Sequence, residues 1–316
     1  MPKTTTQKAY LKLILAIVAW AGVYHSANYL VKTLDPYTTA FVRYFIASII
    51  LVSIVKIRRG KVVDVPLFKA NWLLLLNIGI IGIGLYNIAF FGAEQRLSPQ
   101  MVVLIFSFSP CLTALLASIF MRQRLGIGGY LGLLIALSGT IGVINFANPS
   151  CGQYFCLNMF AHISSGEIYA LCLCTLSAIF SLLNRVATER NIDSLTITTS
   201  AAVFGCLVLF IMLLAFGDYQ HIFMQSFKFW LAMAYTAVIG SVMAYFWYSE
   251  AIKNLGVANV VVFLNGIPFV TILIGVVIFG EPVALTTIFC GAVIISGVIL
   301  TNFMIQHDDA SKPNNT

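Results

Sequence analysis

Apolar residues in this chain fall into long blocks separated by short polar segments. Uncharged runs recur, for example residues 10–31, broken only by Lys12, and residues 257–280. About 20 apolar residues cross the hydrocarbon core as a helix, because lipid offers the backbone polar groups no other hydrogen-bond partner. The pattern therefore predicts ten spans, at roughly residues 10–32, 36–56, 72–95, 100–121, 128–147, 166–188, 196–216, 229–252, 257–279 and 284–304.

The same arrangement of blocks occurs twice. A shift of 158 positions, without a gap, superimposes residues 93–123 on residues 251–281. We therefore expect two five-helix units joined by an outer loop and followed by a cytosolic tail. The units are residues 1–150 and 166–304, the outer loop is residues 151–165, and the tail is residues 305–316. Because each unit has an odd number of spans, the second enters the membrane from the opposite side, as in the inverted repeats of secondary transporters.

The composition is that of a membrane protein. The chain is 60% hydrophobic and 9% charged, whereas a soluble domain carries about 25% charged residues. The predicted fold class is an all-α membrane protein of ten helices in two inverted five-helix repeats. The net charge of +7 is spread between the spans. No basic cluster with interleaved aromatic residues stands on a soluble module, so nucleic acid is not an expected partner.

The positions of the basic residues indicate the orientation. With the N-terminus in the cytosol, 14 of the 18 Lys and Arg residues lie in cytosolic segments, three lie in outer loops, and Arg43 lies inside a span. Basic residues are enriched in cytoplasmic loops. We therefore expect a multi-pass protein of the cytoplasmic (inner) membrane with both termini in the cytosol.

Polar residues inside the first span form a stripe. Trp20, Tyr24 and Asn28 are spaced four residues apart, and His25 lies beside them. Residues at this spacing share one helix face. Such groups are costly in lipid, so they either line a cavity or bond to a neighbouring helix. His25 has the further alternative of carrying a proton.

Arg43 is the cation that lies well inside a span. One interpretation is a clamp for an anionic or carboxylate group of a substrate. The other is a side chain that snorkels outward or pairs with Asp35 or Glu94. A similar choice applies to Glu250, which is close to Lys253 at a helix end, where an ion pair is the simpler account.

Further candidates come from positions that the repeat matches. The shift places Asn87 on Tyr245 and Ser107 on Asn265. Aromatic rings on facing helices suit an amphipathic solute, although they also occur facing lipid or at the membrane interface. The full set of candidate substrate-binding residues is Trp20, Tyr24, His25, Asn28, Arg43, Tyr86, Asn87, Phe90, Ser107, Tyr245, Tyr248 and Asn265.

Each unit carries one proline inside a matched span. Pro110 and Pro268 each remove a backbone hydrogen bond, which frees the carbonyls of Phe106 and Leu264. The same interruption in both units indicates a hinge or a cavity-lining helix, and a purely structural kink is the alternative.

Two cysteines fall in the outer loop. Cys151 and Cys156 either form a disulfide, if the outer face is oxidising, or remain free thiols. The chain shows no CxxC motif, no metal-ligand spacing and no nucleophile–base–acid arrangement, so we expect no metal, no cofactor and no enzyme activity. A channel would need rings of like residues or a selectivity loop, and neither is visible.

These residues resemble those of a known family. The segments LSGTIGVI (137–144) and NGIPFVTILIGVVIFGEP (265–282), with Trp20, Pro36, Arg43 and Pro110, are similar to the EamA-type transporters of the drug/metabolite transporter superfamily. The chain departs from the family pattern at Gln123, where Glu is usual. The resemblance implies ten helices, a central cavity walled by both units, and alternating access. It also implies substrates such as amino acids or related small metabolites, which are most often exported.

The expected function is secondary transport of a small amphipathic metabolite by alternating access, in the direction of export. An importer or exchanger of a nucleoside-type or other metabolite is the alternative within the same fold. The expected partners are a small-molecule substrate and the lipid bilayer, with protons as a candidate coupling ion. We expect the protein to be a monomer or a weak homodimer.

Overall fold

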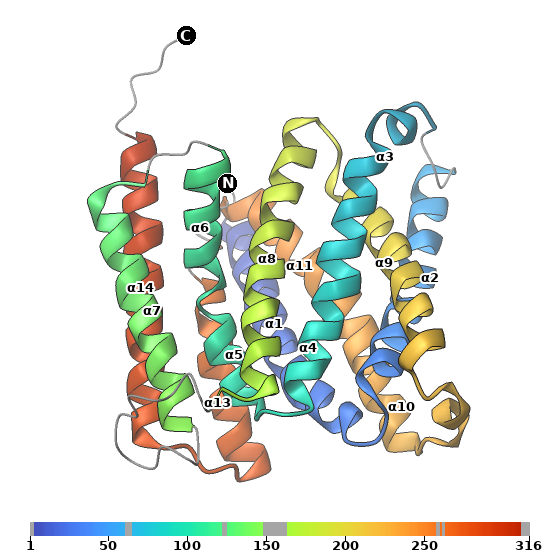
Figure 1. Ribbon diagram of the computed structural model, residues 1–316. Helices are drawn as coiled ribbons and strands as arrows, with labels where there is room; N and C mark the ends of the chain where they lie inside the picture. The colour runs from blue at the N-terminus through green and yellow to red at the C-terminus, as the bar shows by residue number, and fades with distance from the viewer. Residues whose placement is uncertain are drawn as a thin grey trace.

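The computed structural model describes residues 3–310, except for 61–64, 122–124, 148–162, 257–259 and 261–262. The described residues form a bundle of helices that run between two faces (Figure 1). The single-element helices are α1 (Lys3–Val31), α2 (Pro36–Arg59), α7 (Ile127–Ala147), α8 (Ser165–Glu189), α9 (Ser194–Phe216), α13 (Gly266–Phe279) and α14 (Leu285–Ala310). A short 3-10 helix, η3 (Tyr219–Met224), follows α9.

Three further spans consist of consecutive elements. These are α3 (Val65–Gly79), η1 (Ile80–Leu85) and α4 (Tyr86–Glu94); α5 (Pro99–Phe106) and α6 (Ser109–Phe120); and α10 (Phe227–Ala234), η4 (Tyr235–Met243) and α11 (Ala244–Leu255). In the described part of the chain, nine helical segments are long and apolar enough to cross a membrane, and α13 is a shorter apolar helix. They correspond to the ten predicted spans, so the prediction of an all-α membrane protein is confirmed.

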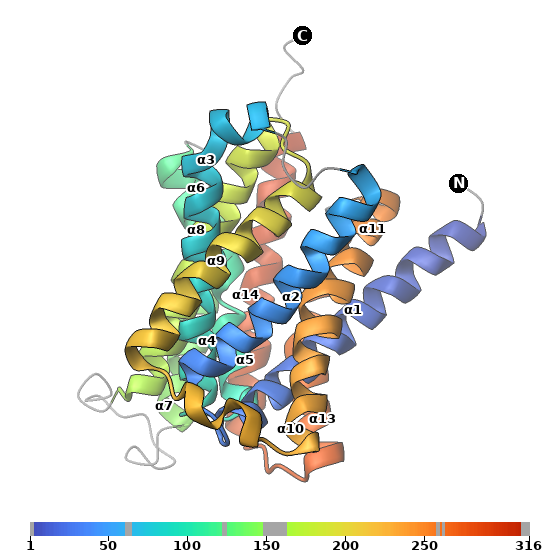
Figure 2. The same ribbon diagram turned by 90° about the vertical axis from the view of Figure 1, so that its right-hand side faces the viewer.

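The two units run in opposite directions. Helix α1 begins and α14 ends at the same face, at the top of Figures 1 and 2, and we call it the terminal face; the opposite face is the distal face. Helix α1 starts at the terminal face, whereas α8, which begins the second unit, starts at the distal face. The inverted arrangement predicted from the odd number of spans per unit is therefore confirmed.

Both units contain a π-helical segment at the matched place. Residues 80–85 of η1, shifted by 158, coincide with residues 238–243 inside η4. Gly82 and Gly240 occupy equivalent positions in them. A π-helix widens the turn and redirects the side chains that follow, and such segments are frequent at functional sites. The pattern of apolar blocks along the chain does not predict these segments.

Glycines allow helices to approach closely, as expected for membrane bundles. A Cβ on Gly79 would lie 2.4 Å from the Cβ of Phe204 in α9, and one on Gly297 of α14 would lie 2.4 Å from the backbone nitrogen of Ala136 in α7. Gly132 also meets α14, where a Cβ would be 2.6 Å from the nitrogen of Thr301. Gly79 and Gly132 therefore lie at close contacts between helices.

The prolines lie just after breaks in two helices. The fourth span is interrupted at Ser107 and Phe108, and Pro110 stands in the first turn of α6. In the second unit Asn265 forms the turn and Pro268 stands in the first turn of α13. The matched interruption therefore exists in both units, and Ser107 and Asn265 mark it. Cys151 and Cys156, the candidate disulfide, lie outside the described residues.

Candidate functional site

Aromatic side chains from both units surround a central cavity of about 260 Å³. We call it the aromatic chamber, and its defining side chains are Trp20, Tyr24, Arg43, Tyr44, Tyr86, Phe90, Tyr245 and Tyr248. Their rings pack edge to face: Trp20 lies 5.4 Å from both Tyr245 and Tyr248, and Tyr24 lies 5.5 Å from Phe90. The Trp20 Nε1–H group donates to the Gly240 carbonyl over 3.1 Å, which ties α1 to η4.

Arg43 of α2 supplies a positive charge to this chamber. Its Nε–H donates to Ser241 Oγ over 2.9 Å, and one Nη1–H donates to Asn87 Oδ1 over 3.3 Å. The guanidinium also lies over the rings of Tyr44, Phe90 and Phe91, at 5.4–5.7 Å. The two polar partners lie in or next to the π-helical segments, since Ser241 lies in η4 and Asn87 is the second residue after η1.

The charge of Arg43 has no balancing carboxylate in the described part of the chain. Its side chain is only 6% exposed, and no ion pair to it is present among the described residues. The expected alternatives of pairing with Asp35 or Glu94, or of snorkelling outward, therefore do not match the structure. A buried cation without a counter-ion costs several kcal/mol, and a desolvated contact with one aromatic ring offsets about 2 kcal/mol of that cost.

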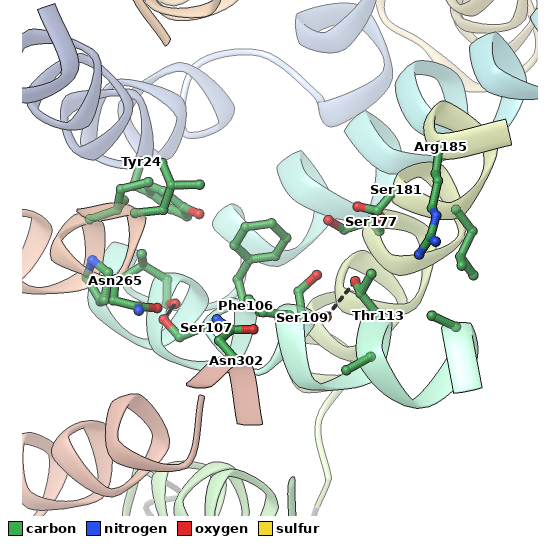
Figure 3. A pocket seen from close by; sticks show the side chains of 18 residues that line it. Tyr24, Phe106, Ser107, Ser109, Thr113, Ser177, Ser181, Arg185, Asn265 and Asn302 are labelled. Carbon is green, nitrogen blue, oxygen red and sulfur yellow. Dashed lines mark hydrogen bonds between the residues drawn. The ribbon is translucent and has the colours of Figure 1, made fainter. Parts of the chain in front are cut away.

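A second cavity of about 470 Å³ continues the chamber. The two cavities share six lining residues: Tyr24, Phe106, Ser177, Ser181, Leu264 and Ile267. Figure 3 shows hydroxyl and amide groups around it, and we call it the polar vestibule. Its polar side chains are Ser107, Ser109, Thr113, Ser177, Ser181, Arg185, Asn265 and Asn302. Because Ala117 and Arg185 lie near the ends of α6 and α8 at the terminal face, the vestibule extends toward that face.

The distal side of the bundle holds a group of contacts that we call the distal closure, formed by the side chains of His25, Gln100, Phe279 and Glu281 with the backbone carbonyl of Thr271. His25 Nε2 lies 2.9 Å from the Thr271 carbonyl, and its ring stacks on Phe279 at 4.9 Å. Gln100 donates to Glu281 over 2.7 Å. These contacts join α1, α5 and the end of α13. The bundle therefore holds a cavity that extends toward one face and a polar closure at the other.

Nine of the twelve candidate substrate-binding residues line the two cavities. Trp20, Tyr24, Arg43, Tyr86, Phe90, Tyr245 and Tyr248 line the chamber, Ser107 and Asn265 line the vestibule, and Tyr24 lines both. Pro110 and Pro268, the candidate hinges, also line the vestibule. The structure thus brings together residues that the repeat and the helical spacing selected.

The other three candidates do not line either cavity. Asn28 donates to the backbone carbonyls of Glu94 and Leu97, at 2.6 and 3.2 Å, so it bonds to a neighbouring segment. Asn87 is fully buried and holds Arg43, and His25 belongs to the distal closure. For Asn28 and His25 the alternative of an interhelical hydrogen bond is the one that the structure shows.

Some lining residues were missed. Ser177 and Ser181 of α8 face the vestibule (Figure 3), and their spacing of four residues in an apolar span was an available signal. Tyr44, beside Arg43, also lines the chamber and was not among the candidates.

The expected pairing of Glu250 with Lys253 is wrong, because the Glu250 carboxylate pairs with Lys12 of α1 at 2.5 Å. Lys253 is close to Glu250 in the sequence, but the cation that Glu250 contacts in space is Lys12, on another helix.

Comparison with known proteins decides the family. The model of the EamA-like transporter family matches residues 7–145 and 164–303. The chain belongs to the EamA-like transporter family. An uncharacterized transporter, YyaM of Bacillus subtilis, is 25% identical over 94% of each chain. Another uncharacterized transporter, from Archaeoglobus fulgidus, is 22% identical over 93% of this chain and 98% of its own.

This EamA-like protein also shares its fold with a solved structure. A crystal structure with 18% sequence identity superimposes with a TM-score of 0.58, covering 96% of this chain and 99% of the other. The family match and the relatives together make the protein a membrane transporter.

Proposed function

We propose that this EamA-like transporter moves a small amphipathic metabolite bearing a carboxylate, such as an amino acid or a close relative, by alternating access. The observation that carries the proposal is the buried, unbalanced charge of Arg43 inside a chamber walled by aromatic rings. A carboxylate would supply the missing counter-ion and accept hydrogen bonds from the guanidinium. The rings would stack on the apolar part of the same molecule.

The dimensions of the cavities are compatible with this solute. The vestibule, at about 470 Å³, falls within the range of about 300–1,000 Å³ typical of small-molecule sites, and the chamber that continues from it, at about 260 Å³, lies just below that range. Its serine, threonine and asparagine groups provide hydrogen bonds along the route from the terminal face. A molecule would cross a polar region before its charged group reaches Arg43.

The proposed direction is export from the cytosol across the cytoplasmic membrane. The bias of basic residues favours a cytosolic terminal face, and the vestibule extends toward that face. An exporter must load its substrate from the cytosol, so the described conformation suits the loading state. Import or exchange would use the same cavity. Measurements of flux in each direction distinguish these modes from export.

The test is counterflow into proteoliposomes that contain the purified full chain. The panel would hold amino acids, the amides of the same amino acids, and a nucleoside. We expect the acids to be transported and the amides to compete at least about tenfold less well, because a hydrogen bond to a charged group contributes about 1.5–3 kcal/mol. Equal transport of acid and amide, or transport of the nucleoside alone, would contradict the proposal.

A pair of arginine variants assigns the effect to the chamber. Arg43→Gln should abolish the preference for the acid over its amide while the protein still inserts and folds. Arg96→Gln is the matched control, because Arg96 also lies over an aromatic ring, that of Tyr169, but outside both cavities. An unchanged preference in Arg43→Gln would show that the carboxylate binds elsewhere.

A further inference from the structure

The distal closure is built around the carboxylate of Glu281. Its Oε2 accepts a hydrogen bond from Gln100 Nε2 at 2.7 Å, and its Oε1 lies 3.9 Å from His25 Nδ1. Gly280 makes the turn that brings Glu281 back over the end of α13, with a φ of 64° that favours glycine. The Glu281 N–H then donates to the Gly275 carbonyl over 3.0 Å.

Gly275 leaves the space that this carboxylate occupies. A Cβ at position 275 would lie 2.6 Å from Gln100 Nε2, 2.9 Å from Glu281 Oε2 and 3.2 Å from His25 Cε1. The absence of a side chain therefore allows three elements to meet around one carboxylate. The closure is a specific polar contact and does not consist of apolar packing alone.

A second carboxylate, Glu94, lies at the end of α4 close to this closure. Its side chain is fully buried, and neither carboxylate oxygen has a hydrogen-bond partner among the described residues. The Glu94 backbone carbonyl accepts a hydrogen bond from Asn28, so the residue is held against α1, the helix that carries His25. A buried carboxylate without a donor is costly as an anion, and binding a proton removes the charge.

The charged groups around Glu94 offer no hydrogen bond to its carboxylate. Glu281 and Lys32 are close enough to act on Glu94 electrostatically. Arg43 of α2 donates to Ser241 and Asn87, and Arg96 donates to the Gly92 carbonyl. On α8, Glu167 caps its own helix through Ser164. Glu281 thus adds a second negative charge near Glu94 when the closure is shut.

We propose that Glu94 is a proton-binding site whose occupancy is linked to the distal closure. In the closed state the Glu94 carboxyl holds a proton taken from water at the distal face. When the closure opens, water reaches the group, the O–H bond breaks and the proton returns to that water. A ligand that binds one of two states more tightly shifts the equilibrium toward that state. Protons therefore favour closure, and a rise in pH favours opening.

The proposal rests on the alternating-access function, because the closure is then one of its two gates. Its test needs no substrate, so the two can fail separately. Thr271→Cys places a thiol beneath the closure, at a side chain that is fully buried, and keeps the carbonyl that His25 contacts. Labelling of this thiol by a membrane-impermeant maleimide from the distal side reports opening.

In the Thr271→Cys background we expect the labelling rate to rise with pH between about 5 and 8 more than thiol ionisation alone explains. Glu94→Gln, which mimics the protonated group, should label slowly at every pH, about fivefold or more below the parent at pH 8. At a given pH the intrinsic reactivity of the thiol is the same in every variant, so a difference in labelling rate reports a difference in accessibility. Glu94→Ala removes the carboxylate altogether and should also label slowly at every pH. With two variants, the test remains valid if one of them folds poorly.

Glu167→Gln is the matched control. Glu167 is also buried, at 3% exposure, and starts α8 at the same face, but its carboxylate accepts a hydrogen bond from the Ser164 N–H at 2.8 Å. This variant should keep the pH profile of the parent. If Glu94→Gln and Glu94→Ala retain that profile, or if Glu167→Gln removes it equally, Glu94 is not the site and the proposal is wrong.

Discussion

Asp35 and Asp193, 158 positions apart, begin equivalent helices in the same way at opposite faces of the bundle. Asp35 Oδ1 accepts from the N–H of Thr38 at 3.0 Å, and Asp193 Oδ1 accepts from the N–H of Thr196 at 3.1 Å. Each aspartate is the N-cap of its helix, α2 at the distal face and α9 at the terminal face. An N-cap satisfies a backbone N–H that the helix leaves without a partner. The repeat thus preserves both the helix and its start.

The inversion predicts from which side of the membrane positions 122 and 282 are accessible. Cysteines introduced by Arg122→Cys and Pro282→Cys, in a background without native cysteines, should react with an impermeant reagent from opposite sides of the membrane. With the terminal face in the cytosol, only the thiol at position 282 is labelled in intact cells. Labelling of both from outside, or protection of both, would contradict the proposed orientation.

The Asp193 cap predicts a small effect of pH on stability. Burial raises the pKa of this carboxyl, but hydrogen bonds from Thr196 and Arg59 outweigh it and leave the pKa below its ordinary value. The stabilisation is therefore present above the unfolded pKa of about 3.9 and is lost as the pH falls through the lower folded pKa. Asn also caps helices well, so Asp193→Asn removes chiefly the charge.

We expect Asp193→Asn to lower the free energy of unfolding by less than about 1 kcal/mol at pH 7, because the pair with Arg59 is half exposed. Thermal unfolding in detergent would show a constant difference in Tm between pH 7 and about 5, shrinking below about 4. A difference that grows on acidification would have the wrong sign and would contradict the assignment.

Gly275→Ala should open the distal closure. The added methyl group meets Gln100 and Glu281, and the latter is held on the short turn at Gly280, so their 2.7 Å hydrogen bond must lengthen or break. We expect faster labelling of the Thr271→Cys thiol, by about fivefold or more. Val276→Ala is the control, since Val276 is exposed on the same helix. Equal labelling in both variants would show that the closure tolerates the methyl group.

The matched prolines predict opposite shifts in conformation. Pro110→Ala restores a backbone N–H that can donate to the Phe106 carbonyl, and Pro268→Ala restores one that can donate to the Leu264 carbonyl. Each added hydrogen bond favours a continuous helix across the break. Because the units are inverted, one variant should favour opening at the terminal face and the other at the distal face. Labelling of Ser181→Cys and Thr271→Cys would report the two faces.

Pro99→Ala is the control for both, because the residue four positions before Pro99 is Gln95, which lies in the turn after α4, so the restored N–H has no preceding helix to continue. Normal transport and unchanged labelling in both proline variants would make Pro110 and Pro268 packing features. A shift of both in the same direction would contradict the link to the inverted repeat.

Gly297→Ala should destabilise the contact between α7 and α14. The new Cβ would lie 2.4 Å from the Ala136 nitrogen and 2.5 Å from the Gly132 oxygen, and backbone atoms cannot turn aside. Overpacking costs about 1–3 kcal/mol, which exceeds the gain of up to about 1 kcal/mol in helix propensity. A lower Tm is expected, whereas the exposed neighbour in Ser296→Ala should change stability by less than about 0.5 kcal/mol.

The sequence determined the spans, the repeat and most of the chamber. Lipid forces each apolar block into a helix, and an odd number of helices per repeat requires inversion. Helical spacing then selected Trp20 and Tyr24, and the match between the two halves selected Tyr245, because polar groups inside a membrane usually face the interior of the bundle. These inferences need only local periodicity and the matching of two halves.

Tertiary structure decided which polar groups bond to one another. Periodicity gives the direction of a side chain around its own helix, but not the residue that faces it. Asn28 and Asn87 had the right spacing and yet bond to a backbone segment and to Arg43. Gln100 and Glu281 meet across 181 positions only because α5 packs against α13. Contacts of this kind depend on how helices cross, which no single helix encodes.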